Sequence, residues 1–352
     1  MDVNLAYRGK RVFITGHTGF KGGWLLTLLN TLGAEVHGFA LAPDTSPNLF
    51  ELADLQSMLA SHTIGDICQP DLLRQAIDRV RPEIVFHLAA QPLVRASYRA
   101  PILTWQTNVL GTAHVLEGVR HCPSVRAVVA VTTDKCYDNR EWHWGYRETD
   151  RLGGYDPYSA SKAACELLVD SYRKSYLEER QTIIATARAG NVIGGGDWAE
   201  DRLIPDAVRA VQQRQPLVLR RPAATRPWQH VLAPLHGYLL LGACALRGDP
   251  QVNGAFNFGP NAQGNLAVGE LLHRLQRYWP ELQTLHQPDY DAPHEAALLH
   301  LDSSKAQQLL GWQSRWSLDE SLQYTADWYR TVLDEPQQAR ALTLSQIERY
   351  FS

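Results

Sequence analysis

Cysteine is scarce in this chain, and neither sign of charge predominates. The five cysteines among 352 residues include no Cys-x-x-Cys pair, so neither a zinc site nor a disulfide framework is expected. Basic residues number 34 and acidic residues 37, which leaves no positive excess of the kind that binds nucleic acid. These shortages argue against a metal-binding, disulfide-rich or nucleic-acid-binding protein.

Long apolar runs are also lacking. No uninterrupted apolar stretch has the length of a membrane span, and the N-terminal residues do not resemble a signal peptide. Apolar residues nevertheless make up 45% of the chain, enough to form a large buried core. We therefore expect a soluble protein of the reducing cytoplasm.

What the chain does contain, close to its start, is a glycine-rich loop between a strand and a helix. Residues 11–15 have the pattern of a buried strand, and residues 24–32 that of a helix. Gly16 permits a tight turn, Gly19 lets the backbone approach a pyrophosphate, and Gly22 allows close helix packing. The N–H groups at the start of the helix would face the phosphates. Such a loop alone is more often a simple turn, but its place between strand and helix indicates dinucleotide binding.

Further apolar strands alternate with helical stretches along the first half of the chain. Nearly continuous apolar runs joined by helices are typical of parallel strands covered on both faces. The expected strands after the first are residues 35–41, 61–67, 83–90, 126–133 and 182–188. The fold class is therefore α/β, with a Rossmann-type, doubly wound parallel sheet whose ligands gather at the carboxyl ends of its strands.

The remainder of the chain is less regular and predicts a smaller α/β lobe. The expected elements are helices over residues 203–213, 235–247 and 268–279 and strands over 216–220 and 255–259. We therefore divide the chain into a nucleotide-binding domain, residues 1–189, and a mainly substrate-binding lobe, residues 190–352. Later segments are expected to return to the first domain, because no linker separates the two.

Tyr158 and Lys162 are four residues apart, so on a helix their side chains would lie on one face, one turn apart. An isolated tyrosine keeps its proton until about pH 10, but a neighbouring ammonium, or the positive ring of a bound nicotinamide, would lower that pKa. The tyrosine could then accept a proton from a substrate. The alternative is that both are surface residues of an amphipathic helix.

These features together resemble a known family. The glycine loop, the strand end Leu88-Ala89-Ala90, the triplet Thr133-Asp134-Lys135 and the Tyr158-x-x-x-Lys162 pair are similar to those of the extended short-chain dehydrogenases/reductases that act on nucleotide sugars. The runs ITGHTGFKGGWL, ARAGNVIGGGDWAEDRLIPD and RPWQHVL resemble most the nucleotide-sugar 4,6-dehydratases, in particular those acting on CDP-glucose. The resemblance spans nearly the whole chain. It implies a hydro-lyase that serves deoxysugar biosynthesis of the O-antigen type in lipopolysaccharide.

In the resembled family the sugar is oxidised at C4, loses water across C5 and C6, and regains the hydride at C6. The resemblance implies that Tyr158 takes the C4 hydroxyl proton, that Thr133 bonds the same hydroxyl, and that Lys162 holds the cofactor's ribose. Asp134 would protonate the departing C6 hydroxyl, and Lys135 would remove the C5 proton. A lysine can act as a base only if its pKa falls towards neutrality. The alternative is that Lys135 merely forms an ion pair with Asp134.

The resemblance also implies which residues bind the two ligands. The cofactor would contact Gly16, Thr18, Gly19, Phe20, Lys21, Gly22, Asp66, Ile67, Leu88, Ala89, Ala90, Tyr158 and Lys162. The nucleotide sugar would contact Ser97, Asn191, Arg202, Arg226 and His294. Guanidinium groups suit the diphosphate of such a substrate. Asp66 could instead be a turn residue or a helix cap, and Ser97 an N-cap. The other four substrate-binding residues could instead be solvated surface residues.

The cofactor is expected to be NAD. The acidic residue that usually ends the second strand and binds the ribose is missing, and Ala40-Leu41-Ala42-Pro43 stands in its place. No arginine follows that strand to receive a 2′-phosphate, and a reaction that returns its hydride suits a retained cofactor. NAD is therefore favoured over NADP, and no metal is expected.

Other functions compete with this one. A nucleotide-sugar 4-epimerase would share the fold, the cofactor and the Tyr158–Lys162 pair, but it has no use for the acid and base at Asp134 and Lys135. A dehydratase for another nucleotide sugar stays open, because the cytosine rests on resemblance alone. A non-catalytic NAD-binding protein is less consistent with the complete set of Thr133, Tyr158 and Lys162.

The resemblance further implies a homodimer or a tetramer. The resembled family pairs two helices across a two-fold axis as a four-helix bundle, and the corresponding segments here are residues 108–120 and 158–176. The apolar residues of the first segment are Val109, Leu110, Ala113, Leu116 and Val119. The alternative is that these residues pack on the parent sheet.

Overall fold

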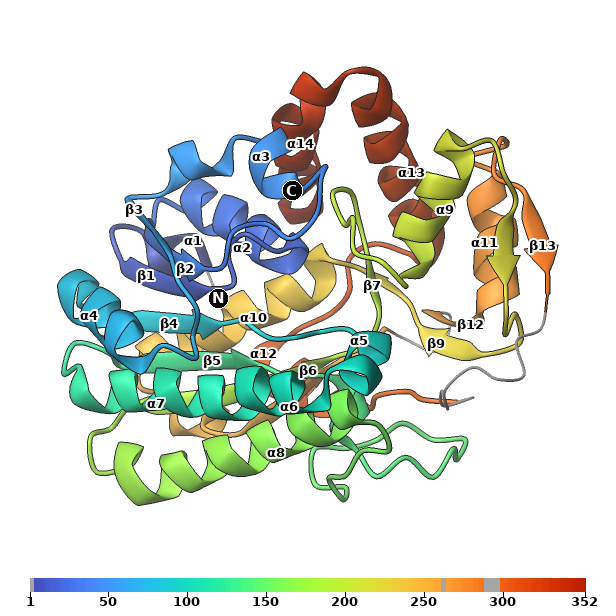
Figure 1. Ribbon diagram of the computed structural model, residues 1–352. Coiled ribbons are helices and arrows are strands. Elements are labelled where there is room, and N and C mark those ends of the chain that lie inside the picture. The colour runs from blue at the N-terminus through green and yellow to red at the C-terminus, as the bar shows by residue number, and fades with distance from the viewer. Residues whose placement is uncertain (1–2, 261–263, 288–297) are drawn as a thin grey trace.

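The centre of the protein is a seven-stranded parallel sheet (Figure 1). The computed structural model describes residues 3–260, 264–287 and 298–352. The strand order is β11-β6-β5-β4-β1-β2-β3, and every neighbouring pair is parallel. The strands are β1 (Arg11–Thr15), β2 (Glu35–Ala40), β3 (Ser61–Ile64), β4 (Ile84–His87), β5 (Ala127–Val131), β6 (Ile183–Ala189) and β11 (Ala255–Phe258). The predicted Rossmann-type fold is confirmed, with the strand order reversing between β1 and β4, where such sheets bind ligands.

Helices cover both faces of the sheet. Successive side chains along a strand point to opposite faces, so they enter two different apolar cores. On β1, Val12 and Ile14 belong to one core and Phe13 to the other. The covering helices are α2 (Phe20–Thr31) and α10 (Leu232–Leu246) over the first core, and α4 (Pro70–Val80), α7 (Gly111–His121) and α8 (Pro157–Tyr172) over the second. In Figure 1, α4, α7 and α8 lie together along one side of the sheet. This two-sided burial explains why the strands are apolar without alternation.

The rest of the chain forms further helices and short strands beside the sheet, with α9 (Leu203–Gln212), α11 (Val268–Gln276) and β13 (Thr284–His286) on the side away from α4 (Figure 1). Three two-stranded sheets pair β7 (Val192–Ile193) with β10 (Gln229–His230), β9 (Thr225–Pro227) with β12 (Asn265–Ala267), and β8 (Leu217–Leu219) with β13 (Thr284–His286). The other helices are α1 (Val3–Tyr7), α3 (Leu49–Leu52), α5 (Val94–Arg99), α6 (Pro101–Trp105), α9 (Leu203–Gln212), α11 (Val268–Gln276), α12 (Ser304–Leu310), α13 (Leu318–Asp334) and α14 (Ala339–Phe351).

Several late segments return to the first part of the chain. β11 pairs with β6 at the edge of the main sheet, from Ala255 opposite Thr186 to Phe258 opposite Ala189. The helix α10 packs on β5 and β6, and α14 packs against α2 and α3. The chain therefore passes back and forth across the predicted boundary near residue 189, and the exact division into domains stays a prediction.

Three strands end two or three residues earlier than the sequence predicted, whereas β6 ends one residue later. β3 ends at Ile64, β4 at His87 and β5 at Val131, two to three residues before the expected ends. Beyond these points the backbone leaves the ladder at the carboxyl edge of the sheet and forms loops. Among the helices in the described parts of the chain, none is both long and apolar enough to cross a membrane.

Candidate active site

The carboxyl ends of the strands open into one large cavity of about 1090 Å³. Its walls come from the glycine loop, from the loops after β2 to β6, from the start of α8, and from the segments around α9 and β8. With two exceptions, every predicted site residue lines this cavity. Such a volume is at the upper end of the range for ligand sites, which suits two ligands better than one.

Ser97 and His294 are the two exceptions. Ser97 is fully buried on α5, where its hydroxyl donates a hydrogen bond to the Val94 carbonyl at 2.6 Å, and it does not line the cavity. The hydroxyl is therefore committed to its own helix, as is common for serine within helices. His294 lies outside the described residues. The roles suggested for both residues stay predictions.

The glycine loop is shaped by close approaches that exclude side chains. Gly16 has a φ of +80°, and a Cβ placed on it would lie 2.7 Å from the Ala89 backbone nitrogen. A Cβ on Gly22 would lie 2.0 Å from the Gly16 carbonyl oxygen, so the start of α2 can sit directly against the turn. A Cβ on Gly19, the N-cap of α2, would meet only that same oxygen, at 3.5 Å. The loop thus offers open backbone at a helix N-terminus, which fits a dinucleotide pyrophosphate.

The other side chains at this end of the cavity make structural contacts. Thr18 donates a hydrogen bond to the Leu41 carbonyl at 2.9 Å and so ties the glycine loop to the end of β2. Asp66 accepts one from the Cys68 backbone N–H at 2.8 Å, as a turn residue does. Ile67 points into the second core. Their contacts with a cofactor stay predictions.

Tyr158 and Lys162 lie on α8, where the sequence placed them, and both are more than nine-tenths buried. The helix begins sharply because Asp156 caps it: the Asp156 carboxylate accepts hydrogen bonds from the Ser159 backbone at 2.9 Å and the Ser159 hydroxyl at 2.6 Å. Pro157 occupies the first helical position, where its missing N–H costs nothing. These residues fix where Tyr158 enters the cavity.

The pKa of Tyr158 differs from the sequence prediction. Burial raises the pKa of Tyr158 well above its ordinary value, and the Thr133 hydroxyl only partly opposes that increase. Lys162 is not among the groups that lower the pKa of Tyr158. Its ammonium donates to the Val131 carbonyl at 3.1 Å, and burial lowers the pKa of Lys162 itself. In the protein alone, desolvation therefore outweighs the neighbouring charge and keeps the phenol protonated.

The Thr133–Lys135 segment forms a tight turn after β5. Thr133 caps it, accepting a hydrogen bond from the Lys135 backbone at 3.3 Å and donating one to Asp134 Oδ1 at 3.0 Å. The Lys135 ammonium lies 3.5 Å from the same Oδ1, so the ion pair considered from sequence is present. Asp134 is almost fully buried, and its Oδ2 has no hydrogen-bond partner among the described residues. A Cβ on Gly190 would lie 3.0 Å from this oxygen, so glycine keeps the approach to it open.

Arginines gather where the second lobe meets the sheet. Arg226, on β9, donates to the Thr225 carbonyl at 2.9 Å, and Arg202 pairs with Asp197 at 2.9 Å. Asp201 lies within 3.6 to 4.0 Å of guanidinium nitrogens from three arginines that sequence reasoning did not select, Arg95, Arg99 and Arg220. The first two belong to α5 and the third follows β8, so only the fold brings them together.

Lys21 reaches from the glycine loop towards the catalytic residues. Its ammonium lies 5.9 Å from the centre of the Tyr238 ring and makes no hydrogen bond or ion pair within the described structure. Burial lowers its pKa to about 8, and the positive charge of Arg202 adds to the lowering. Tyr238 is fully buried on α10, and sequence reasoning missed it because nothing local distinguishes it from a core residue.

The lowered pKa of Lys21 predicts a pH-dependent stability cost. An unfolded lysine titrates near 10.4, so at neutral pH both states carry the charge and the folded state bears a penalty of roughly 1–3 kcal/mol. Above pH 8 the folded state loses its proton first, and the penalty fades. Lys21→Met should therefore stabilise the protein at neutral pH, with a gain that shrinks as pH rises. Denaturant unfolding at several pH values measures this.

The exposed Lys174, just beyond α8, offers a matched control for that measurement. Lys174→Met should change stability by less than about 0.5 kcal/mol at each pH. A Lys21→Met protein that is less stable than the wild type at neutral pH would contradict the expected cost of burial. It would mean that the contact with the Tyr238 ring is the larger effect.

The fold and the site together define a class of protein. A Rossmann-type sheet with a glycine loop after its first strand, and a buried Tyr-x-x-x-Lys pair beside a Thr-Asp-Lys turn, is the arrangement of an extended short-chain dehydrogenase/reductase. The family model described as GDP-mannose 4,6 dehydratase matches residues 13–325. The chain is also 47% identical over 335 residues to the CDP-glucose 4,6-dehydratase of Salmonella typhimurium, covering 94% of this chain and 93% of that protein. It belongs to the GDP-mannose 4,6-dehydratase family.

Solved structures share the fold at lower identity. The UDP-glucose 4-epimerase of Thermotoga maritima, determined with UDP-glucose, matches with a TM-score of 0.80 and 21% identity over 92% of this chain and 99% of that one. The Thermus thermophilus UDP-glucose 4-epimerase, in complex with NAD, matches with a TM-score of 0.78 and 23% identity. The match covers 91% of this chain and 99% of that one. At this identity the likeness establishes the fold alone.

Proposed function

We propose that this protein is an NAD-dependent hydro-lyase that converts CDP-glucose to CDP-4-dehydro-6-deoxyglucose. The observation that carries the proposal is the turn after β5. It presents a buried carboxyl, Asp134, and an ammonium, Lys135, in the cavity that also holds Tyr158. The Salmonella relative that bears the name CDP-glucose 4,6-dehydratase supports the same reaction.

NAD would bind along the glycine loop and the carboxyl ends of β1 and β4, where it would supply an acceptor for the C4 hydride and the source of the hydride returned to C6. The open backbone at Gly19, the N-cap of α2, supports this placement, because a Cβ placed there would meet only the Gly16 carbonyl oxygen, at 3.5 Å. The neighbour solved with NAD supports the choice of cofactor. The positively charged nicotinamide ring would also favour the phenolate of Tyr158 and so lower the pKa that burial raises in the protein alone.

Three residues would handle the oxidation at C4. Tyr158 takes the proton of the C4 hydroxyl as the hydride leaves, and Thr133 holds that hydroxyl in place. Lys162, already bonded to the Val131 carbonyl, has ammonium protons left for a ribose hydroxyl. Oxidation makes the C5 proton acidic, because the carbanion left at C5 is stabilised by the new ketone.

Asp134 and Lys135 would carry out the elimination. The ion pair would first pass one proton from the Lys135 ammonium to the Asp134 carboxylate. Lys135, then a neutral amine, removes the C5 proton, and the C6 hydroxyl leaves as water with the proton held by Asp134. The product of this step is a C5–C6 alkene conjugated with the ketone. Hydride addition at C6 and return of the proton to C5 complete the reaction, with Asp134 left ionised until it regains a proton. The unpartnered Oδ2 of Asp134 is the atom suited to this role.

The nucleotide end of the substrate would lie among the arginines. Arg202, Arg226 and Asn191 line the same cavity, and guanidinium groups suit its two phosphates. Ser97 and His294 complete the predicted set and await a direct test. We further place the protein in the cytoplasm, because all five cysteines are free thiols and four of them are buried.

The proposal is tested by incubation with NAD and either CDP-glucose or UDP-glucose, reading the absorbance of the 4-keto product in base. We expect product from CDP-glucose and much less from UDP-glucose. A 4-epimerised sugar without loss of water would favour the epimerase, which has no use for Asp134 and Lys135. Product from UDP-glucose alone would show that the protein is a dehydratase for another nucleotide sugar. No turnover of either sugar would favour a non-catalytic NAD-binding protein.

We also propose a homodimer formed through the face built by α6, α7 and α8. Large apolar side chains are exposed on and around these helices, namely Ile102, Leu103, Trp105, Leu110, Leu167 and Tyr176. Figure 1 shows α6 and α7 following each other along one helical run, with α8 alongside it at the outer surface. Two residues predicted for this contact are excluded from it, because Leu116 and Val119 are buried in the second core of their own chain. The alternative that they pack on the parent sheet holds for this pair.

A double variant tests the dimer. Leu110→Asp with Leu167→Asp places two charges in the proposed contact, and we expect the mass in light scattering to fall to the 39.5 kDa of one chain. Leu309→Asp, on the exposed side of α12, should leave the wild-type mass unchanged. A wild-type protein that is fully active at the mass of one chain would refute the dimer, whereas twice or four times that mass would support it.

A further inference from the structure

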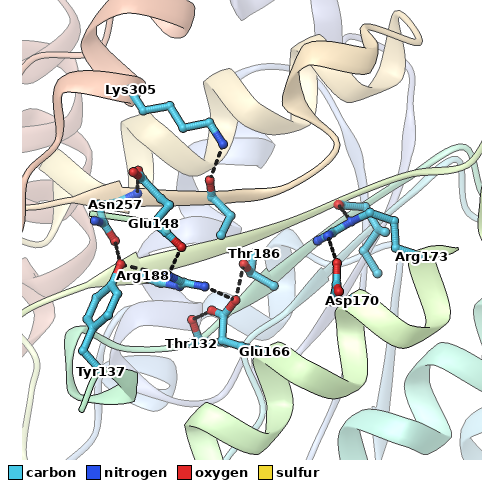
Figure 2. A network of polar contacts seen from close by, with 12 residues as sticks. Thr132, Tyr137, Glu148, Glu166, Asp170, Arg173, Thr186, Arg188, Asn257 and Lys305 are labelled. Carbon is cyan, nitrogen blue, oxygen red and sulfur yellow. Dashed lines mark hydrogen bonds and ion pairs between the residues drawn. The ribbon is translucent and has the colours of Figure 1, made fainter. Parts of the chain in front are cut away.

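A buried ion pair lies directly behind the Thr133–Lys135 turn. Glu166, on α8, and Arg188, on β6, approach within 2.8 Å, and both side chains are more than nine-tenths buried (Figure 2). A charged pair at this depth costs desolvation energy, and such pairs add stability only when their remaining polar atoms are satisfied. Nothing in the proposed chemistry uses either residue directly.

The Glu166 carboxylate is fully engaged. It accepts hydrogen bonds from the Thr132 hydroxyl at 2.5 Å and from the Thr186 hydroxyl at 2.7 Å, besides the Arg188 contact. Burial by itself would raise the pKa of Glu166, but Arg188 and the two hydroxyls outweigh burial and lower it. These contacts therefore favour the ionised carboxylate, which lies beside Thr132 at the end of β5.

Arg188 contacts Tyr137, the residue at the C-terminal end of the turn. One of its nitrogens donates to the Tyr137 hydroxyl at 2.8 Å, and its guanidinium lies 5.0 Å from the centre of the Tyr137 ring. The Tyr137 hydroxyl in turn donates to Asn257, on β11, at 2.7 Å. Figure 2 shows Thr132 and Tyr137 held from the two sides of the same ion pair.

Thr132 immediately precedes the catalytic turn and Tyr137 closes it. Both ends of the turn that bears Thr133, Asp134 and Lys135 are thus bound to one buried pair. The helix α8 adds a third link, because Glu166 lies one turn beyond Lys162 and two turns beyond Tyr158 on the same face. Lys162 bonds the Val131 carbonyl and Glu166 bonds the next residue, Thr132, so helix and strand end are joined at successive positions.

We propose that Glu166 and Arg188 are positioning residues that clamp the catalytic turn at both ends and fix it relative to Tyr158 and Lys162. The functional groups of a site must be held closely for catalysis, and a misplacement of about 1 Å can cost ~100-fold in rate. The sequence signal would have been a glutamate four residues after Lys162, continuing the stripe of Tyr158 and Lys162. The inference rests on the proposed function only for its effect on rate.

Two threonines allow the clamp to be tested without removing a buried charge. Thr132→Val and Thr186→Val each delete one hydroxyl that donates to the same carboxylate, and both side chains are buried. Of these two threonines, only Thr132 adjoins the turn, whereas Thr186 lies on β6. We expect Thr132→Val to lower kcat at least tenfold with KM nearly unchanged, Thr132→Ser to restore most of it, and Thr186→Val to stay within about twofold of wild type.

Hydrogen exchange provides a readout that needs no substrate. The amides of Lys135 and Cys136 bond to Thr133 within the turn, and Thr132→Val should speed exchange in the peptide over residues 132–138 at least tenfold. Thr186→Val should leave that peptide protected. Equal protection and equal kcat in both valine variants would overturn the clamp. Faster exchange in Thr132→Val, together with a wild type inactive on every nucleotide sugar, would keep the clamp and reject the proposed function.

Discussion

Tyr158→Phe is expected to fold normally, bind NAD and substrate, and lose turnover by about 10³-fold or more. The substitution removes one oxygen from a buried side chain and keeps the ring, so packing on α8 changes little. What it removes is the group proposed to accept the C4 hydroxyl proton, and general acid–base catalysis of this kind contributes about 10²–10⁴ in rate. Steady-state kinetics and equilibrium binding of the substrate separate the two effects.

Tyr172 provides the matched control on the same helix. Its hydroxyl donates to Glu117 at 2.8 Å, outside the residues that line the cavity. Tyr172→Phe therefore also loses one hydrogen-bonded hydroxyl, and it should keep near-normal turnover. Near-normal turnover in Tyr158→Phe itself would end the assignment of Tyr158 as the proton acceptor. The pairing with Lys162 would then be only structural.

Lys135→Met and Asp134→Asn should stop the reaction after oxidation. Tyr158, Thr133 and Lys162 are intact in both variants, so C4 can still lose its hydride. Elimination then lacks its proposed base or its proposed acid, and product formation should fall by about 10²–10⁴-fold. Reduced nicotinamide should accumulate with bound substrate, which its absorbance reports in a single-turnover experiment.

The ion pair between Lys135 and Asp134 makes this prediction a decisive one. A lysine that serves only as a partner for the 3.5 Å contact would not be needed for removal of the C5 proton. A wild-type product rate in Lys135→Met would therefore return that residue to a structural role. Lys174→Met is the control, because Lys174 also pairs with an aspartate, Asp170 at 2.7 Å, on the protein surface.

The two predictions together distinguish a dehydratase from an epimerase of the same fold. Both enzymes need an acceptor for the C4 proton, so both would be impaired by loss of Tyr158. Only a reaction that breaks bonds at C5 and C6 needs Asp134 and Lys135 beside it. Accumulation of reduced cofactor in the second set of variants, with none of the dehydrated product, is thus the specific signature.

The local motifs were readable from the sequence because each depends on residues only a few positions apart. The strand, glycine loop and helix over residues 11–32 follow from apolar patterning and from backbone freedom at Gly16 and Gly22. The shared face of Tyr158 and Lys162 follows from helical periodicity alone. The parallel sheet followed from apolar runs that alternate with helices.

The meeting of distant segments was decided by the tertiary structure. Asp201 lies beside Arg95, Arg99 and Arg220, and no pattern in the sequence links those positions. The inward packing of Leu116 and Val119 was also undecided, because an apolar helix face does not specify whether the sheet or a second subunit covers it. In the structure, Leu116 and Val119 are both buried in the second core of their own chain.

The electrostatics of the site depended on the tertiary structure as well. From sequence, the charge of Lys162 was expected to lower the pKa of Tyr158, whereas in the fold burial raises it. The buried Glu166–Arg188 pair also depends on distant partners, because Thr132, Thr186 and Tyr137 bond most of its polar atoms. Arg188 Nε alone of the pair's side-chain nitrogens and oxygens has no hydrogen-bond partner among the described residues. By itself, therefore, the sequence determined the elements and the catalytic motifs, which rest on local periodicity and backbone conformation. Which side chains lose water, and which partners then compensate them, was decided by packing between segments far apart in the chain.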